Sequence, residues 1–154
     1  MHFIKQYWRW MLVGWIAFVF IQSLFFKFSN SLETQHIFGT LGDWLGLQWF
    51  SDYGGYMVGL AELIAALIMF TRYWAWGALL AFEIMCGAIV FHLFTPLGVK
   101  MPVYDQNGMV VGDDAGLLFV MACFTCASAL TLVVNDWVSE NSQIRKVFNR
   151  SSGS

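Results

Sequence analysis

The sequence predicts an all-α membrane protein built as a four-transmembrane-helix bundle. We also expect an interfacial amphipathic helix between spans 1 and 2 and a short outer β-hairpin between spans 3 and 4. Composition is the first reason: 58% of the 154 residues are hydrophobic and 12% are charged, whereas soluble domains are about 25% charged. Length is the second, because four apolar runs each approach the ~20 residues that an α-helix needs to cross ~30 Å of hydrocarbon.

The four spans are expected at residues 10–28, 54–71, 75–94 and 115–134, within one domain over residues 1–138. Tyr7 and Trp8 precede the first span, as interfacial aromatic residues do. Lys27 lies near the far end of this span. Its long side chain can reach the headgroups there or form a buried ion pair.

The polar stretch after the first span predicts a surface helix of about three turns. Asn30 and Glu33 have the spacing of a capping box. Apolar residues then recur on one helical face, and the helix is expected to end near Gly46; those residues are Ile37, Phe38, Leu41, Trp44 and Leu45. We expect this segment, and the aromatic residues Trp49 and Tyr53 after it, to lie along the membrane surface over the bundle.

The second and third spans each carry one carboxylate. Gly55 and Gly59 lie on the same helical face as Glu62 in the second span, so close helix approach would bury Glu62. Residues 71–74 are too few for more than a turn, which makes these two spans antiparallel neighbours. Glu83 lies near the middle of the third span.

The segment after Pro96 predicts a hairpin, because Asn107-Gly108 is flanked by β-branched residues. The fourth span follows Asp113 and Asp114. Residues 139–154 form a polar tail that we expect to be partly disordered, and Ser151–Ser154 has the composition of a tag or linker scar.

The positions of lysine and arginine predict the orientation. Lys27 and Lys100 fall on one side of the membrane, and six basic residues fall on the other, namely Lys5, Arg9, Arg72, Arg145, Lys146 and Arg150. The positive-inside rule then places both termini in the cytoplasm. The outer face is acidic, and the lipid bilayer, rather than nucleic acid, is the expected partner.

Four charged or polar residues within the spans are candidate site residues. Lys27 and Glu62 fall at compatible depths, so an ion pair is feasible; it could bind a quinone carbonyl or a substrate anion, or it could only hold two helices together. Glu83 lacks a basic residue at its depth, which indicates a hydrogen-bonded acid or a proton relay, with Gln22 as a candidate hydrogen-bond partner. Gln22 is also a candidate, with Lys27 and Glu62, for binding a substrate or quinone.

His92 and the neighbouring Asp113 and Asp114 are further proton-relay candidates on the outer side, where a carboxylate would orient the imidazole. His36, Met101 and Asp105 map to the same side. No metal-ligand spacing is present among these residues, so we expect no metal site. We also expect no covalently bound cofactor.

Cys123 and Cys126 match the Cys-x-x-Cys pattern, yet inside a helix their Cβ atoms lie ~5–6 Å apart, too far for a disulfide. We therefore expect small packing thiols. Cys86 and Cys123 fall at similar depths, so a disulfide between the two spans is the alternative.

Three short motifs resemble the DoxX/DoxD-like family of small four-helix membrane proteins. They are Lys27 in FFKF, the G-x-x-E-L-x-x-x-L pattern of Gly59, Glu62, Leu63 and Leu67, and the D-x-G pattern of Asp114 and Gly116. The resemblance covers residues 10–136. It implies a bacterial or archaeal cytoplasmic (inner) membrane protein. Some members are quinone-reducing subunits of a thiosulfate:quinone oxidoreductase, and others are membrane partners of redox-defence enzymes.

Three functions remain open. The first is a membrane subunit of a redox system, in which a quinone or a small lipophilic substrate binds near Lys27 and Glu62 and a redox partner protein docks on the outer face. This hypothesis predicts an apolar pocket with a few polar groups. The second is a non-catalytic scaffold or assembly factor, which predicts a filled bundle with Lys27 and Glu62 paired. The third is a small transporter or proton path through Glu62 and Glu83, which would require a homo-oligomer.

Overall fold

The computed structural model describes the backbone of residues 2–151 and the side chains of residues 7–147. The helices are α1 (His2–Phe28), α2 (Leu32–Leu45), α3 (Gln48–Met69), α4 (Trp74–Phe94), α5 (Leu117–Val138) and α6 (Gln143–Ser151), and the strands are β1 (Pro102–Tyr104) and β2 (Val110–Asp113). Four helical stretches are long and apolar enough to cross a membrane: Tyr7–Phe28, Gln48–Met69, Trp74–Phe94 and Leu117–Val138. The expectation of four apolar helices is confirmed.

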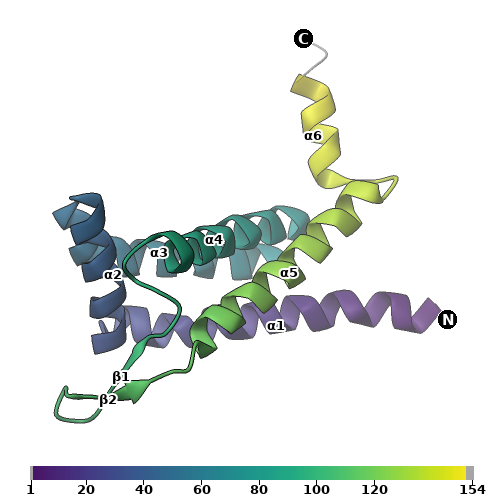
Figure 1. The fold of residues 1–154 in the computed structure, drawn as a ribbon. Helices are drawn as coiled ribbons and strands as arrows, with labels where there is room; N and C mark the ends of the chain where they lie inside the picture. Colours follow the sequence, from purple (N-terminus) through teal and green to yellow (C-terminus); the bar gives the residue numbers. More distant parts are fainter. Residues whose placement is uncertain (1, 152–154) are drawn as a thin grey trace.

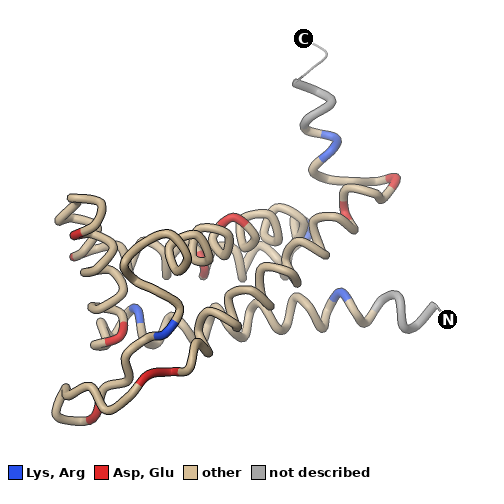
Figure 2. The backbone as a smooth tube through the Cα atoms, viewed as in Figure 1, with Lys and Arg blue, Asp and Glu red and all other residues tan. Residues whose placement is uncertain are grey.

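The long helices lie side by side, and the short elements gather at the two ends (Figure 1). Helix α3 packs against α1, α2 and α4, and α5 packs against α4 and α1. Helix α2 and the two strands lie at one end, which we call the Lys27 end (Figure 1). The α3–α4 turn at Phe70–Tyr73 and helix α6 lie at the opposite end, which we call the Arg72 end. Most charged residues lie toward these two ends (Figure 2).

Small residues let α3 and α4 approach closely. A Cβ atom added to Gly77 would lie 2.7 Å from the backbone nitrogen of Met69 and 2.8 Å from the carbonyl oxygen of Ala65. Ala78 and Ala81 are fully buried on the same helix. Around this seam the core is filled by larger apolar side chains from α1, α3 and α5, including Val13, Ile16, Phe20, Met69 and Leu132.

Helix α2 begins and ends close to the expected residues, although its cap differs. Ser31 is the N-cap, and its Oγ accepts a hydrogen bond from the backbone N–H of Thr34 at 3.3 Å. Asn30 has a positive φ of 50° and lies outside the helix. Gly46 ends the helix with φ 68°, a conformation that glycine adopts without steric cost.

Helix α3 begins at Gln48, six residues before the expected start at residue 54. Trp49 and Tyr53 therefore belong to α3 and not to a separate surface segment. The reason is packing: Phe38 of α2 lies against Gly54 and Gly55, where added Cβ atoms would come within 2.6 and 3.4 Å of its ring. Gly54 and Gly55 therefore lie inside α3, where the absence of a side chain lets α2 approach closely.

The expected hairpin is present. Strands β1 and β2 pair antiparallel, with Val103 opposite Gly112. Asp105 Oδ1 accepts hydrogen bonds from the backbone N–H groups of Asn107 and Met109, and Gly108 has φ 77°. The backbone donors in the turn hold the pKa of Asp105 below its ordinary value, although partial desolvation opposes this effect.

Part of the polar tail, Gln143–Ser151, forms α6; its partial disorder stays a prediction. Asp136, at the end of α5, is buried and caps this helix: its carboxylate accepts hydrogen bonds from the backbone N–H groups of Gln143 and Ile144 and from the Ser142 hydroxyl. An aspartate after a long apolar run gave no indication of this role. Residues 152–154 of the expected scar lie outside the described residues.

Two glycines on α4 provide a test of the α3–α4 seam. Gly77→Ala would force a methyl group into the α3 backbone, so we expect the free energy of unfolding in detergent to fall by about 1–3 kcal/mol. Gly87→Ala is the matched control, because nothing lies within 4 Å of its added Cβ; we expect unchanged or higher stability. Equal losses for both variants would contradict this packing.

Candidate functional site

Of the two alternatives for Lys27, the structure contains the ion pair with Glu62, and a third residue joins it. Lys27 Nζ donates hydrogen bonds to Glu62 Oε1 and Oε2, each at 2.6 Å. Ser23 Oγ donates to Glu62 Oε2 at 2.5 Å and accepts a bond from Lys27 Nζ at 3.1 Å. We refer to Ser23, Lys27 and Glu62 as the Lys27 cluster.

Local packing holds the Lys27 cluster between α1 and α3. Gly59, one turn before Glu62, allows the approach, since its added Cβ would lie 3.5 Å from the Cβ of Lys27. The rings of Phe28 and Tyr56 stack beside it, with centroids 6.2 Å apart. A glycine on α3 and an aromatic pair thus fix the register between the two helices.

The Lys27 cluster is largely shielded from solvent. The side chain of Lys27 is 15% exposed and that of Glu62 is 3% exposed. Both carboxylate oxygens have a hydrogen-bond donor, so the acid is fully paired. The opposite charges of Lys27 and Glu62 offset each other inside the apolar bundle.

Ser23 was not predicted as a site residue. Gln22, which was considered as a partner of Glu83 and as a quinone-binding residue, is exposed on the surface of α1. Ser23 and Lys27 are four residues apart and share one helical face, so this spacing was the signal available in the sequence. A small hydroxyl next to a lysine in an apolar span has several ordinary roles, which is why spacing alone did not single it out.

Glu83 is exposed on α4. It lies about 14 Å along the helix axis from Trp74, close to the middle of the candidate span. The ion pairs within residues 7–147 are Lys27–Glu62 and Lys100–Asp113, so Glu83 has no cationic partner there. Glu62, in contrast, is buried in the bundle, and the two acids are not brought together.

His92 and Asp114 lie near each other at the Lys27 end. His92 is 9% exposed, its Nδ1 donates a hydrogen bond to the carbonyl oxygen of Gly98 at 2.6 Å, and its ring meets Phe119 edge to face. Because a carbonyl can only accept, Nδ1 carries a proton. The proton-relay role of His92, Asp113 and Asp114 stays a prediction.

Asp114 caps the start of α5. Its carboxylate accepts hydrogen bonds from the backbone N–H groups of Met101, Gly116 and Leu118 at 2.8–2.9 Å. Desolvation would raise the pKa of Asp114, but these donors and the nearby charge of His92 outweigh it and lower the pKa. Asp113 is exposed and pairs with Lys100 at 3.6 Å.

The cysteines meet in a different pairing from the one considered. Cys86 Sγ of α4 lies 3.7 Å from Cys126 Sγ of α5, and all three cysteines are free thiols. The contact with Cys86 is therefore made by Cys126 and not by Cys123. In the described part of the chain, no three His, Cys, Asp or Glu side chains are grouped so as to hold a metal ion.

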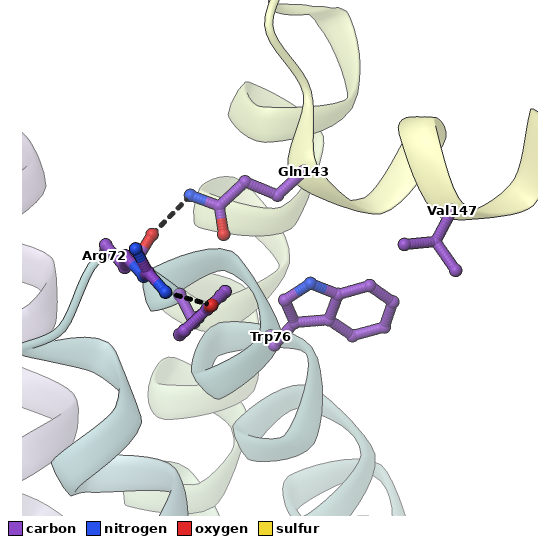
Figure 3. Close-up of a pocket in the computed structure, with 5 residues that line it drawn as sticks. Arg72, Trp76, Gln143 and Val147 are labelled. Atoms are coloured by element: carbon purple, nitrogen blue, oxygen red, sulfur yellow. Dashed lines mark hydrogen bonds between the residues drawn. The ribbon is translucent and has the colours of Figure 1, made fainter.

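The surface of the described residues includes two open hollows. One, of about 490 Å³, is apolar and follows the outer side of α1, lined by Ile21, Leu24, Phe25, Phe28 and Ser29. The other, of about 470 Å³, lies at the Arg72 end beside Arg72, Tyr73, Trp76, Gln143 and Val147 (Figure 3). There Gln143 Nε2 donates to the carbonyl oxygen of Arg72 at 2.7 Å and ties α6 to the α3–α4 turn.

Comparison with known proteins gives no match from which the class of this protein could be inferred, so its class rests on its fold and sites. No protein-family model, curated protein or solved structure matches the chain. The four apolar helices are compatible with an integral, multi-pass membrane protein.

The cap at Asp114 predicts a pH-dependent stability. Asp114→Asn removes the charge and one acceptor, so at pH 7 we expect unfolding in detergent to cost about 1–3 kcal/mol less than in the wild type. The pKa of Asp114 is lowered by folding, so its contribution is complete above the unfolded pKa of about 3.9 and is lost as pH falls through the folded pKa. The free energy of unfolding of the variant should therefore fall less steeply than that of the wild type as the pH is lowered.

Asp113→Asn is the matched control, because Asp113 is exposed and accepts one backbone hydrogen bond, from Ala115. We expect a smaller loss of stability at pH 7, and a decrease in stability at low pH that is as steep as in the wild type. Melting curves recorded between about pH 3 and pH 7 measure both variants. An equally steep decrease in stability at low pH for the wild type and Asp114→Asn would contradict the capping role.

Proposed function

We propose that the protein is a DoxX-like membrane subunit of a redox system that handles a quinone or another small lipophilic substrate. The observation that carries the proposal is the Lys27 cluster. Two of the three motifs that resemble the family, those of Lys27 and Glu62, come from different helices and meet in one shielded ion pair. The third motif, that of Asp114, caps α5 at the same end of the bundle.

The apolar hollow on α1 supports a lateral route to the Lys27 cluster. Leu24 and Phe28 line the hollow and also flank Gly59, next to Lys27. A quinone ring in the hollow would be apolar on its faces and would present a carbonyl oxygen to the ammonium group of Lys27. The bond from Lys27 to Ser23 is its longest, at 3.1 Å, and is the one that a carbonyl would replace.

The same proposal places the protein in a bacterial or archaeal cytoplasmic membrane with both termini in the cytoplasm. Helix α2 and the hairpin would then face the outer side, together with Asp105 and Asp113. The basic residues of the Arg72 end support this orientation. A redox partner protein would dock on the outer side.

A second candidate is a non-catalytic scaffold or assembly factor. Two observations favour it: both oxygens of Glu62 are already paired, and the hairpin exposes Met109, Val110 and Val111 by 61–64%. An exposed apolar strand edge next to acidic residues is suited to pairing with a partner chain. In this function the Lys27 cluster only holds α1 against α3.

Quinone binding separates the two candidates. We expect short-tailed ubiquinone or menaquinone analogues to raise the melting temperature of the purified protein, by an amount equivalent to about 2.7 kcal/mol at 100 times the Kd. Lys27→Met should abolish the rise. Ile21→Trp, which fills the hollow without touching the Lys27 cluster, should also abolish it.

Lys100→Met is the matched control, since Lys100 is an exposed lysine at the same end. It should keep the full quinone-dependent rise. If no quinone shifts the melting temperature of the wild type, and Lys27→Met lowers the stability of the ligand-free protein alone, the redox proposal is wrong and the scaffold function is favoured.

A further inference from the structure

The contact between Cys86 and Cys126 brings two free thiols together in the interior of the chain. Their sulfur atoms are 3.7 Å apart across the α4–α5 seam, and both residues are half-buried. A disulfide bond is ~2.05 Å long, so the two sulfurs must approach by less than 2 Å, which side-chain rotation can supply. Cys123 lies one helical turn before Cys126 and provides an internal comparison.

The position of the sulfur pair restricts what can react with it. Cys86 lies about 18 Å along α4 from Trp74 and about 12 Å from Phe94. In a membrane-spanning helix this depth lies within the hydrocarbon, out of reach of water-soluble thiols and oxidants. A reaction partner must therefore dissolve in the lipid, and quinones are lipid-soluble acceptors of two electrons and two protons.

Glu83 provides an acid–base group beside this pair. It precedes Cys86 by three residues, a spacing that places their Cβ atoms ~5–6 Å apart on the helix surface. Its carboxyl group is exposed and has no cationic partner within residues 7–147. An ionisable side chain facing lipid is costly, by at least ~2.5 kcal/mol on insertion scales, and usually marks a functional position.

We propose that Cys86 and Cys126 form a dithiol–disulfide couple that reduces a lipid-soluble quinone to the quinol. Both S–H bonds break and one S–S bond forms, so the two sulfurs together lose two electrons and two protons. The quinone gains both electrons, and each of its two oxygens gains one proton. Glu83 accepts the proton of Cys86 and passes it to a quinone oxygen.

The reaction transfers equal numbers of electrons and protons from the thiols to the quinone. No net charge therefore enters or leaves the hydrocarbon. The inference rests on the proposed function only in requiring that the protein handle a quinone. It uses different residues, since the sulfur pair joins α4 to α5 whereas the Lys27 cluster joins α1 to α3.

The experiment counts thiols after one exposure to quinone. Full-length protein in liposomes is treated without oxygen with a short-tailed ubiquinone, quenched in acid, unfolded and alkylated, and its intact mass is measured. Of the three free thiols, we expect the wild type to lose two, with one quinol formed per chain. Cys123→Ser should lose both remaining thiols and form the same amount of quinol.

Cys86→Ser and Cys126→Ser should keep both remaining thiols and form no quinol. Cys86→Ala and Cys126→Ala are measured in parallel and should give the same result, so that the test does not depend on the folding of the serine variants. Glu83→Gln should lose the same two thiols more slowly. Three reactive thiols remaining in the wild type, or a loss in Cys86→Ser equal to that in the wild type, would overturn the proposal.

The two proposals fail in different ways. A quinone-dependent melting shift with all thiols still reduced would reject the dithiol couple and leave the proposed quinone site standing. Loss of two thiols and formation of quinol in Lys27→Met, with no melting shift in the wild type, would reject the Lys27 cluster as the quinone site and leave the dithiol couple standing.

Discussion

The ion pair between Lys27 and Glu62 is the constraint on which the rest of the bundle depends. A carboxylate that is 3% exposed among apolar helices must be paired, because an isolated buried charge costs several kcal/mol. Glu62 can meet Lys27 only if α1 and α3 stand in one register, and Gly59 supplies the space for this contact. Once α3 is fixed in this way, its other faces determine where α2 and α4 can pack.

The remaining contacts of α3 follow from small residues facing large ones. Phe38 of α2 packs onto Gly54 and Gly55, so α2 crosses the bundle at the Lys27 end. On another face, Gly77 of α4 touches the α3 backbone. Helix α5 packs against α4, so the contact between Cys86 and Cys126 also depends on where α3 places α4. The positions of both candidate sites therefore depend on α3, which packs against α1, α2 and α4.

The sequence predicted the four apolar helices and the hairpin turn at Asn107-Gly108, since each has a strong local signal in length or turn chemistry. It showed the Lys27–Glu62 ion pair to be feasible by depth, but it left open that Lys27 reaches the headgroups instead. It did not predict which face of α4 points outward, because that helix is apolar all round and Glu83 therefore gave no directional signal. It placed the start of α3 too late, since the helix-breaking tendency of Gly54 is overridden by the packing of Phe38. The contacts of Ser23 with Glu62 and of Cys126 with Cys86 join residues far apart in sequence and could not be predicted from local patterns. Asp136 caps a helix that begins only a few residues later, but that helix was itself not predicted.

A double-mutant cycle tests the central ion pair most directly. The free energy of unfolding in detergent is measured for the wild type, Lys27→Met, Glu62→Gln and the double variant, with Lys100→Met and Asp113→Asn as the matched exposed pair. Loss of one partner of a buried pair costs about 3–5 kcal/mol, so we expect the double variant to lose far less than the sum of the single losses. The exposed pair should show a coupling of about 1 kcal/mol or less. Additive losses at Lys27 and Glu62 would contradict the account.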